Sequence, residues 1–413
     1  MNVIGIVAEY NPFHTGHAHQ IAASRRLLGA DCAVVAVMSG NWVQGGRPAA
    51  LDKWTRARLA LLGGADLVLE LPTVWAVSSA ETFARGATQL LAASQVVDTL
   101  SFGSECGDMD RLCRVACCLN TPEHQERVCR LVRQQLPYAA ARQQAVEELL
   151  GRELAGLLAS PNNNLGVEYL RNLERDGWAM GAVTVRREGA PHDSVLGECA
   201  VSPAEGAASV AHPFLSATQL RLFLERGDWG ALEPYLPEGG LEVLRAGWNG
   251  FPSLVRAERA VLARLRTMAA EDWARLPDSG AGEGLPPRLE RAGRQCRSLE
   301  EFFALAKPRH WTRARLRRLL VWAWLGLTQG DRPDIPPYLR VLAFNGRGRS
   351  LLREMKGRAS LPILTKPAHI RGLSGSARAL FELESRCTDL YDLCLETVPA
   401  PGREWTTGPV ILE

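Results

Sequence analysis

The sequence lacks the features that would mark a membrane-spanning or exported protein. Its apolar stretches, such as Leu319–Leu327, fall far short of the roughly 20 residues that a transmembrane helix needs. The N-terminus lacks the layout of a signal peptide, because Glu9 and His14 interrupt the first apolar residues. We therefore expect a cytoplasmic protein without membrane association.

Paired cysteines are also missing. The ten cysteines are scattered along the chain, and no two of them form a CxxC pair. Structural zinc sites need four ligands, usually at such tight spacings, so we predict no metal-binding residues. Cys113, Cys117 and Cys118 share one helix-like segment. We interpret the thiols as reduced and partly buried, as is usual in the cytosol.

Acidic residues are scarce in one long stretch of the C-terminal half. The whole chain has 413 residues, with 48 Lys and Arg against 45 Asp and Glu, and a formal net charge of +3. Between Glu301 and Arg371, however, 15 basic residues stand against 4 acidic ones. Such asymmetry predicts a polyanionic partner for this part of the chain.

The first hundred residues alternate between strand-like and helix-like segments. Short β-branched or unbroken apolar runs predict strands, and the amphipathic segments between them predict helices. This alternation is typical of a doubly wound parallel sheet, in which ligands bind beyond the carboxyl ends of the strands. The expected strands are Val3–Ala8, Cys32–Met38, Asp66–Leu71 and Val96–Phe102, and the expected helices are Gly16–Leu28, Trp54–Leu62 and Ser79–Ala93.

Later segments predict a helical insertion and a second domain. Residues of about 107–175 have helical patterns, and the strand-like Met180–Val185 then resumes the sheet. From about residue 232 the apolar period is mainly 3.6, with Gly- and Pro-rich breaks. We predict a Rossmann-like α/β domain with a parallel sheet over residues 1–230, and a mainly α-helical, basic domain over 231–413.

Two histidines follow the first predicted strand, in the segment His14-Thr15-Gly16-His17. Side chains three apart at a helix start lie on about the same face, and the helix N-terminus attracts anions. Gly16 would let a ligand approach the backbone closely. Four letters alone are also compatible with a turn that carries surface histidines. The strand before them and the helix after them favour a site for nucleotide phosphates.

A second anion site is suggested by Ser216-Ala-Thr-Gln-Leu-Arg221. The hydroxyls of Ser216 and Thr218 at a helix start, with Arg221 one turn later, could clamp a phosphate. In isolation this segment is a plain helix cap with a solvated arginine. Its combination with the two histidines favours the phosphate clamp.

Together these motifs resemble the HxGH-type nucleotidyltransferases, and specifically the bacterial tRNA(Met) cytidine acetate ligase family. The resemblance covers nearly the whole chain, with its motifs in the right order. It rests on GIVAEYNPFHTGH (Gly5–His17), MSGNWVQGG (Met38–Gly46), DKWTRARLALLGGADLVLELP (Asp52–Pro72), SFGSE (Ser101–Glu105), SPNNNLGVEYL (Ser160–Leu170), TVRREGAPHD (Thr184–Asp193) and LSATQLR (Leu215–Arg221), and more weakly on RHWTRARLRRLL (Arg309–Leu320) and YLRVLAFNGRGRSLL (Tyr338–Leu352).

The resemblance implies an ATP-dependent ligase. ATP would activate acetate as acetyl-adenylate, and the acetyl group would pass to N4 of the wobble cytidine of elongator tRNA(Met), giving N4-acetylcytidine. Such chemistry needs positioning and neutralisation of phosphate charge rather than a protein nucleophile. Magnesium is expected from ATP chemistry, although no Asp/Glu ligand set is evident. The sequence carries no signal for the oligomeric state.

The resemblance also implies a set of site residues. His14 and His17 would hold the phosphates, and Ser39 and Asn41, which follow the second strand, would face the same crevice. Asn162 and Asn163 have a helix cap as their alternative role. The implied ATP-binding residues are Val7, Ala8, Glu9, Tyr10, Asn11, Pro12, Phe13, His14, Thr15, Gly16, His17, Ala18, His19, Gln20, Gly103, Asn162, Asn163, Arg187, Ser216, Thr218 and Arg221, and the implied catalytic residues are His14, His17, Ser39 and Asn41.

The basic segment Arg309–Arg318 is the candidate RNA-binding element. Arginines contact phosphates, and Trp311 could stack on an unpaired base. A solvated basic helix is the alternative, and the leucines among the arginines show that one face is core. Lys53 and Arg56 are candidates for pyrophosphate or RNA contact, with a solvated helix face as their alternative. The predicted RNA-binding residues are Lys53, Arg309, Arg313, Arg315, Arg317 and Arg318.

Two other functions stay open. A small-molecule adenylyltransferase needs little beyond the α/β domain, so the basic helical half argues against it. A non-catalytic tRNA-binding protein would not need the two intact phosphate motifs. The chain also departs from the family pattern at Gly45–Pro48 and next to His192, so the resemblance implies no role for these positions.

Overall fold

A computed structural model describes residues 2–187, 214–280, 284–307 and 311–413. Its centre is a mixed sheet with the strand order β10-β8-β5-β2-β1-β6-β7, and β9 pairs with β8 off this path. The strands β2, β1, β6 and β7 run parallel, and β5 is parallel to β2. These five strands are β1 (Val3–Ala8), β2 (Ala33–Ser39), β5 (Leu67–Leu71), β6 (Thr99–Ser104) and β7 (Gly181–Arg186).

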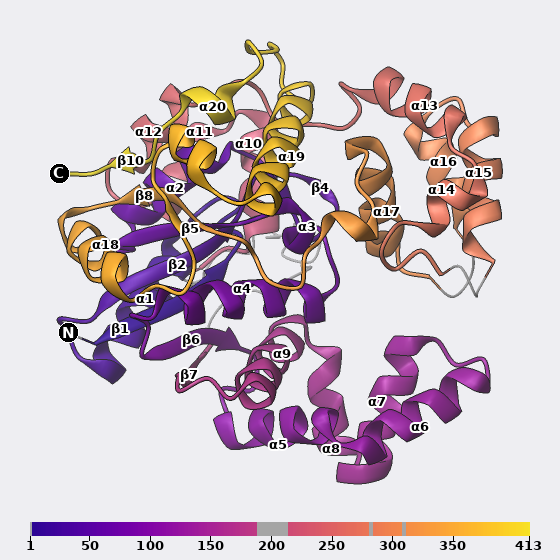
Figure 1. The fold of residues 1–413 in the computed structure, drawn as a ribbon, viewed down its shortest axis with the longest axis horizontal. Helices are drawn as coiled ribbons and strands as arrows, with labels where there is room; N and C mark the ends of the chain where they lie inside the picture. The colour runs from indigo at the N-terminus through magenta and orange to yellow at the C-terminus, as the bar shows by residue number, and fades with distance from the viewer. Residues whose placement is uncertain (1, 188–213, 281–283, 308–310) are drawn as a thin grey trace, which may run out of the picture.

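Helices cover both faces of the sheet, as the unbroken apolar strands predict. Alternate residues of β2 belong to two different hydrophobic clusters, with Val34 and Ala36 in one and Val35 and Val37 in the other. Helices α1 and α2 lie with the first cluster and helix α4 with the second. Figure 1 shows the sheet between these layers. The bounds are α1 (Thr15–Leu28), α2 (Lys53–Leu62), α3 (Thr73–Ala76) and α4 (Ala80–Ser94), and a small hairpin joins β3 (Trp42–Val43) to β4 (Arg47–Pro48).

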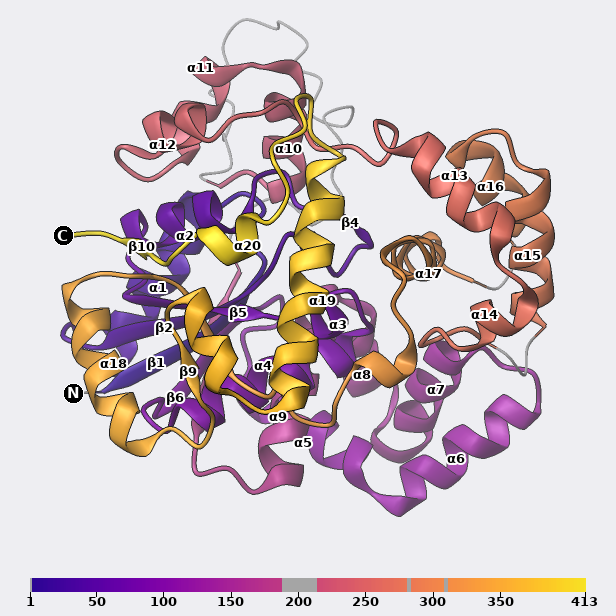
Figure 2. The same ribbon diagram turned by 45° about the horizontal axis from the view of Figure 1, so that its top comes forward.

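The predicted helical insertion between the fourth and fifth parallel strands is confirmed. Its helices pack against one another, and α9 packs on α4 and β6 before β7 rejoins the sheet beside β6. In Figures 1 and 2 the insertion forms one lobe below the sheet. Its elements are α5 (Met109–Asn120), α6 (Pro122–Arg133), α7 (Tyr138–Leu150), α8 (Arg152–Ala155), η1 (Gly156–Ala159) and α9 (Pro161–Asp176).

The C-terminal half is mainly helical, as expected. Figure 2 shows α17 between the sheet and a lobe formed by α13 to α16. Its elements are α10 (Ala217–Arg226), α11 (Trp229–Leu232), η2 (Glu233–Tyr235), α12 (Gly240–Ala246), α13 (Glu258–Thr267), α14 (Ala270–Ala274), α15 (Leu285–Gln295), α16 (Leu299–Ala306), α17 (Arg313–Leu325), η4 (Gln329–Asp331), α18 (Gly346–Arg358), η5 (Pro367–Gly372), α19 (Gly375–Asp392) and α20 (Arg403–Thr406).

Three short strands from this half were not predicted. They are β8 (Leu339–Phe344), β9 (Ile363–Leu364) and β10 (Val410–Ile411). All six residues of β8 are buried, and this strand pairs antiparallel with β5. The apolar run of β8 is too short for its period to distinguish a strand from a helix. The domain boundary at residue 230 stays a prediction, although the sheet takes strands from both sides of it.

The C-terminal tail after Leu395 contributes a buried residue to the protein interior. Glu404 in α20 is 1% exposed and makes ion pairs inside the protein. Within the described residues, no helix combines the length and the apolar character that crossing a bilayer requires.

Candidate active site

The loop after β1 is held by three other parts of the chain. The backbone N–H of Ala50 donates to Asn11 Oδ1 over 2.7 Å, and Arg56 donates to the carbonyl oxygen of Glu9 over 2.6 Å. Arg221, from α10, donates to the carbonyl oxygen of Asn11 over 2.9 Å. The second predicted phosphate motif therefore contacts the loop that leads into the two histidines, across a separation of 210 residues.

The two histidines form a capping box at the N-terminus of helix α1. The N–H of Gly16 donates to His14 Nδ1 over 3.1 Å, and the N–H of His14 donates to His17 Nδ1 over 3.2 Å. Their ring centroids lie 3.9 Å apart. Because each Nδ1 accepts a hydrogen bond, the proton of each neutral ring lies on Nε2. Each imidazole is thus left with one N–H donor for a ligand.

Both histidines are neutral at neutral pH. Burial, and then the charges of Arg187 and Arg221, lower the pKa of His14 to about 3. Burial, His14 and Arg187 also lower the pKa of His17 well below its usual value. The pair therefore contributes hydrogen bonds and not positive charge, and the charge must come from arginines.

These residues line a cavity of about 370 Å³ whose charge is mainly positive. Arg47, Arg187, Arg221 and Arg318 line it, and Glu9 is the single acidic residue among its described lining. Glu9 Oε1 already accepts a hydrogen bond from the backbone N–H of Gln44 over 2.7 Å. Four cations with one engaged carboxylate form a site suited to a polyanion.

The N-terminus of α10 is built as predicted. Ser216 Oγ accepts from the N–H of Gln219 over 3.3 Å, and Gln219 Oε1 accepts from the N–H of Ser216 over 2.9 Å, which is a capping box. Arg221 donates to Thr218 Oγ1 over 2.8 Å. Burial and then the charge of Arg47 lower the pKa of Arg221 to about 10, against the opposing effect of Glu9. Ser216, Thr218 and Arg221 all line the cavity.

A third wall comes from the ends of β6 and β7 and from the start of α9. Gly103, Asn162 and Arg187, the predicted nucleotide contacts of this wall, line the cavity together. A side chain at Gly103 would place its Cβ 3.2 Å from Arg187 Cγ, so glycine leaves room for this arginine. Arg187 donates to Asn162 Oδ1 over 3.4 Å, and Asn162 donates to Glu105 over 2.7 Å.

Asn163 does not line the cavity, which corrects the predicted nucleotide contact. Its Oδ1 accepts from the backbone N–H groups of Glu105 and Cys106 over 2.9 and 3.1 Å. Its own backbone N–H donates to Glu105 over 2.7 Å. Asn163 therefore fixes α9 to the end of β6, closer to the capping alternative.

Some residues of the predicted nucleotide-binding loop point elsewhere. Phe13 is fully buried and packs on Gly63, and the His19 ring lies 5.0 Å from the ring of Phe214. Pro12, Thr15, Gly16 and Ala18 also lie outside the cavity lining, whereas the loop residues that line it are Val7, Ala8, Glu9, Tyr10, Asn11, His14, His17 and Gln20.

Ser39 and Asn41, predicted as catalytic, are corrected to structural roles. Ser39 is fully buried, and its carbonyl oxygen accepts from Arg56 over 3.1 Å. Asn41 Oδ1 accepts from the N–H of Lys53 over 2.8 Å, while its amide nitrogen donates to Thr388 over 3.2 Å. Neither residue is among the lining of the cavity.

Lys53 is also corrected, because it cannot contact RNA. Its side chain is 1% exposed, and its Nζ lies 2.7 Å from Glu70 and 2.6 Å from Glu404. Burial alone would lower the pKa of Lys53, but Glu404 and Glu70 raise it above its usual value. Arg56 is fully buried and donates to backbone carbonyls of the phosphate loop and of β2. Both residues therefore stabilise the elements around the cavity and do not line it.

The apolar floor of the cavity was missed. It consists of Phe83, Phe102, Leu165 and Tyr169, which the patterns marked only as parts of helices and a strand. Tyr169 is 2% exposed, and its hydroxyl has no hydrogen-bond partner among the described residues. In a sequence, such residues are indistinguishable from ordinary core. The hairpin residues Val43 and Gln44 and the helix residue Ala314 were missed as well.

The arginines of α17 divide between two environments. Arg313 is exposed, with its guanidinium 5.8 Å from the ring of Phe303, and Arg315 lies 5.2 Å from the ring of Trp311. Arg317 is half-buried, and Arg318 lines the cavity. Arg309, like His192, lies outside the described residues. Trp322 and Trp324 are buried, as predicted for core residues.

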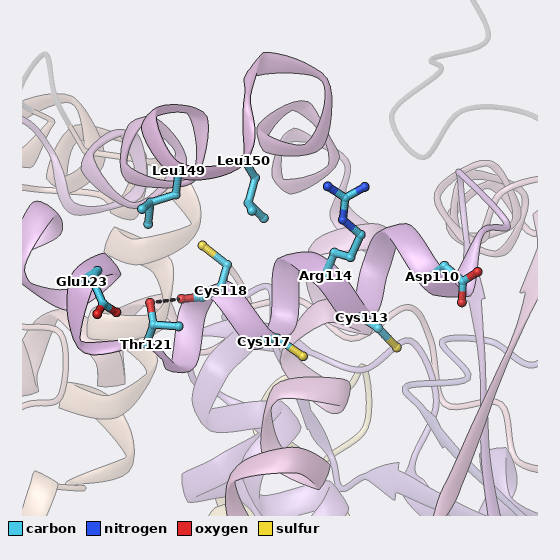
Figure 3. A pocket seen from close by; sticks show the side chains of 9 residues that line it. All are labelled: Asp110, Cys113, Arg114, Cys117, Cys118, Thr121, Glu123, Leu149 and Leu150. Carbon is cyan, nitrogen blue, oxygen red and sulfur yellow. Dashed lines mark hydrogen bonds between the residues drawn. The ribbon is translucent and has the colours of Figure 1, made fainter.

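A second, shallower hollow of about 710 Å³ lies in the insertion (Figure 3). Figure 3 shows Cys118 pointing toward Leu149 and Leu150, while Cys113 and Cys117 point the other way. Burial, and then Glu174, raise the pKa of the Cys117 thiol to about 11, so it stays protonated at neutral pH. This mainly apolar hollow offers no comparable set of convergent cations among its described lining.

Comparisons with known proteins agree with this geometry. The family model described as HIGH Nucleotidyl Transferase matches residues 1–403. A tRNA(Met) cytidine acetate ligase of Thermoanaerobacter sp. (strain X514) is 32% identical over 98% of each chain, and one of Syntrophotalea carbinolica is 37% identical over 98% of this chain and 97% of the relative. The crystal structure of Thermotoga maritima TmcAL bound with alpha-thio ATP has a TM-score of 0.88 at 30% identity and full coverage of both chains. The chain therefore belongs to the HIGH nucleotidyl transferase family, among the tRNA(Met) cytidine acetate ligases.

Proposed function

We propose that the protein is an ATP-dependent ligase that acetylates N4 of the wobble cytidine of elongator tRNA(Met). One observation carries the proposal. In a chain related over its whole length to tRNA(Met) cytidine acetate ligases, two capped imidazoles, the α10 N-terminus and four arginines line a single cavity. That set of donors is suited to a nucleoside triphosphate.

The walls of the cavity suggest how ATP would lie. His14 and His17 would donate from Nε2 to the phosphates, facing the α10 N-terminus with Arg221. Gly103, Asn162 and Arg187 form the wall that would border the adenosine. The neutral imidazoles can contact two phosphate oxygens without repelling the nearby arginines.

The proposed reaction has two steps. A carboxylate oxygen of acetate attacks the α-phosphorus, and the bond from that phosphorus to pyrophosphate breaks. The N4 amine of cytidine then attacks the acetyl carbon, the bond to AMP breaks, and the amine loses its proton. Both steps build negative charge on phosphate oxygens, where the arginines and the imidazole N–H groups would stabilise it.

The described residues do not fit a magnesium site held by the protein. They contain no group of three or more His, Cys, Asp or Glu that could ligate a metal. Glu9, the acidic residue of the cavity lining, already binds the N–H of Gln44. Phosphate oxygens and water would have to supply most ligands of any magnesium ion that accompanies ATP.

Helix α17 is the proposed contact surface for tRNA, with Arg313 exposed and Arg315 half-buried near its start. Arginines on one helix favour phosphate contacts, which provide affinity without sequence readout. We also propose a cytoplasmic location, which the proposed substrates, ATP and tRNA, support.

The test is acetylation with labelled acetate. The protein is incubated with ATP, ¹³C-acetate and an unmodified tRNA(Met) transcript, and the digested nucleosides are analysed by mass spectrometry. Labelled N4-acetylcytidine is expected, and a matched transcript with uridine at the wobble position should give none. Nucleotide transfer to a small molecule without nucleoside acetylation would contradict the proposal and favour a small-molecule adenylyltransferase. Binding of tRNA without ATP turnover would favour a non-catalytic protein.

A further inference from the structure

Helix α17 reaches the nucleotide cavity through the β3–β4 hairpin. Gly46, in the turn of this hairpin, has φ of 68°, and a Cβ there would lie 2.5 Å from the backbone nitrogen of Arg318 and 2.6 Å from the carbonyl carbon of Arg317. On its other side the hairpin is fixed to the phosphate loop by the bond from Gln44 to Glu9. The first turns of α17 are therefore packed against the cavity wall, with no room for a side chain between them.

Arg318 projects from α17 into this wall. Ala314 and Arg318, one helical turn apart, both line the cavity. The Arg318 side chain is 17% exposed, and its nearest recorded carboxylate is that of Asp278 at 3.9 Å. Its Nε is buried without a hydrogen-bond partner among the described residues. Withdrawing this N–H from water without an acceptor is unfavourable.

Burial disfavours the charged form of Arg318, and the neighbouring charges do not offset this effect fully. Burial lowers the pKa of Arg318, with Asp278 opposing and Arg315 adding to the effect. Arg47 and Arg221 share the cavity, and Glu9 is already engaged with Gln44. An anion bound in the cavity would supply an acceptor for Arg318 Nε, and it would offset the repulsion of Arg318 by Arg315 and of Arg221 by Arg47.

We propose that Arg318 binds the phosphates of ATP, and that α17 thereby serves both the nucleotide cavity and the tRNA surface. The assignment rests on the proposed function, because that function identifies the anion as ATP. It replaces the predicted RNA contact of Arg318 with a contact to the phosphates of ATP. Arg313 and Arg315 of the same helix keep their proposed contacts with tRNA.

The test is calorimetric titration of the full-length protein with ATP and with adenosine, without acetate or tRNA. Arg318→Gln should weaken ATP binding at least tenfold and leave adenosine binding within twofold. Arg318→Lys, which keeps the charge, should lose less. The control is Arg353→Gln, which removes an exposed arginine on α18 outside the cavity. Unchanged ATP affinity in Arg318→Gln would overturn the proposal, as would an equal loss for adenosine.

A second pair of variants covers the case in which Arg318→Gln fails to fold. Ala314 lines the cavity and is partly exposed on α17, so a longer side chain there has access to the cavity. Ala314→Glu should weaken ATP binding at least fivefold more than Ala314→Gln, because the two side chains have the same shape and differ in charge. The difference should shrink at high salt. Equal affinities in this pair would overturn the placement of α17 beside the phosphates.

The outcomes separate this inference from the proposed function. ATP binding that depends on Arg318, in a protein that makes no N4-acetylcytidine, would refute the ligase and keep the phosphate contact. Normal acetylation with ATP binding that is insensitive to Arg318→Gln would keep the ligase and refute the contact.

Discussion

Removal of the Lys53 ammonium should lower the free energy of unfolding and should have no direct effect on RNA binding. Lys53 lies between Glu70 and Glu404, which join the end of β5 to the C-terminal helix α20. Both carboxylates are at most 3% exposed. Lys53→Met leaves them buried without their shared cation, and loss of one partner of such a pair costs about 3–5 kcal/mol.

The assay is urea denaturation followed by tryptophan fluorescence, with Lys356→Met as the control. Lys356 is an exposed lysine on α18, and its substitution should change stability by less than about 0.5 kcal/mol. The double variant Lys53→Met/Glu70→Gln should recover part of the loss, because Glu404 keeps its ion pair with Arg340, whereas Glu70 has no other ion pair among the described residues. Lys53→Met with stability within 1 kcal/mol of the wild type would refute the reasoning. Weaker tRNA binding by a stably folded Lys53→Met would restore the RNA role.

Three further predictions concern pH, the phosphates and RNA. Burial, and then Glu70, raise the pKa of Glu384 to about 8, so its folded pKa exceeds its unfolded value. The contribution of Glu384 to stability is therefore full at acid pH and is lost as pH rises toward 8. Glu384→Gln should flatten this part of the curve of unfolding free energy against pH. An unchanged curve would contradict the raised pKa of Glu384. His14→Ala should lower acetate-dependent ATP–pyrophosphate exchange by about 10²–10³, as loss of a preorganised donor does; full exchange would remove the phosphate role of His14. Arg313→Glu should weaken tRNA binding and reduce the slope of log affinity against log salt by about 1, and filter binding that shows no change would exclude α17 from the RNA surface.

The strands and the phosphate motifs could be predicted because their signals are local. Unbroken apolar runs such as β2 are buried on both faces, and the two histidines are placed by one strand end and one helix start. The clamp formed with Arg221 also follows from two local patterns, although only the fold brings them to within a hydrogen bond.

The errors arose where the partners are distant in sequence. Lys53 and Asn41 look like exposed or catalytic polar residues until Glu404 and Thr388, from the last quarter of the chain, cover them. β8 was missed because six residues, five of them apolar and one an arginine, do not define a period. Tyr169 was missed because its place in the cavity floor depends on how α9 packs against β6.

The most direct test of the account follows one oxygen atom. The protein is incubated with ATP, tRNA(Met) and acetate labelled with ¹⁸O at both carboxylate oxygens, and the AMP is analysed by mass spectrometry. If acetate attacks the α-phosphorus and the cytidine amine then takes the acetyl group, each AMP carries one ¹⁸O, and one N4-acetylcytidine forms per AMP. Unlabelled AMP, or release of ADP in place of AMP, would contradict the account.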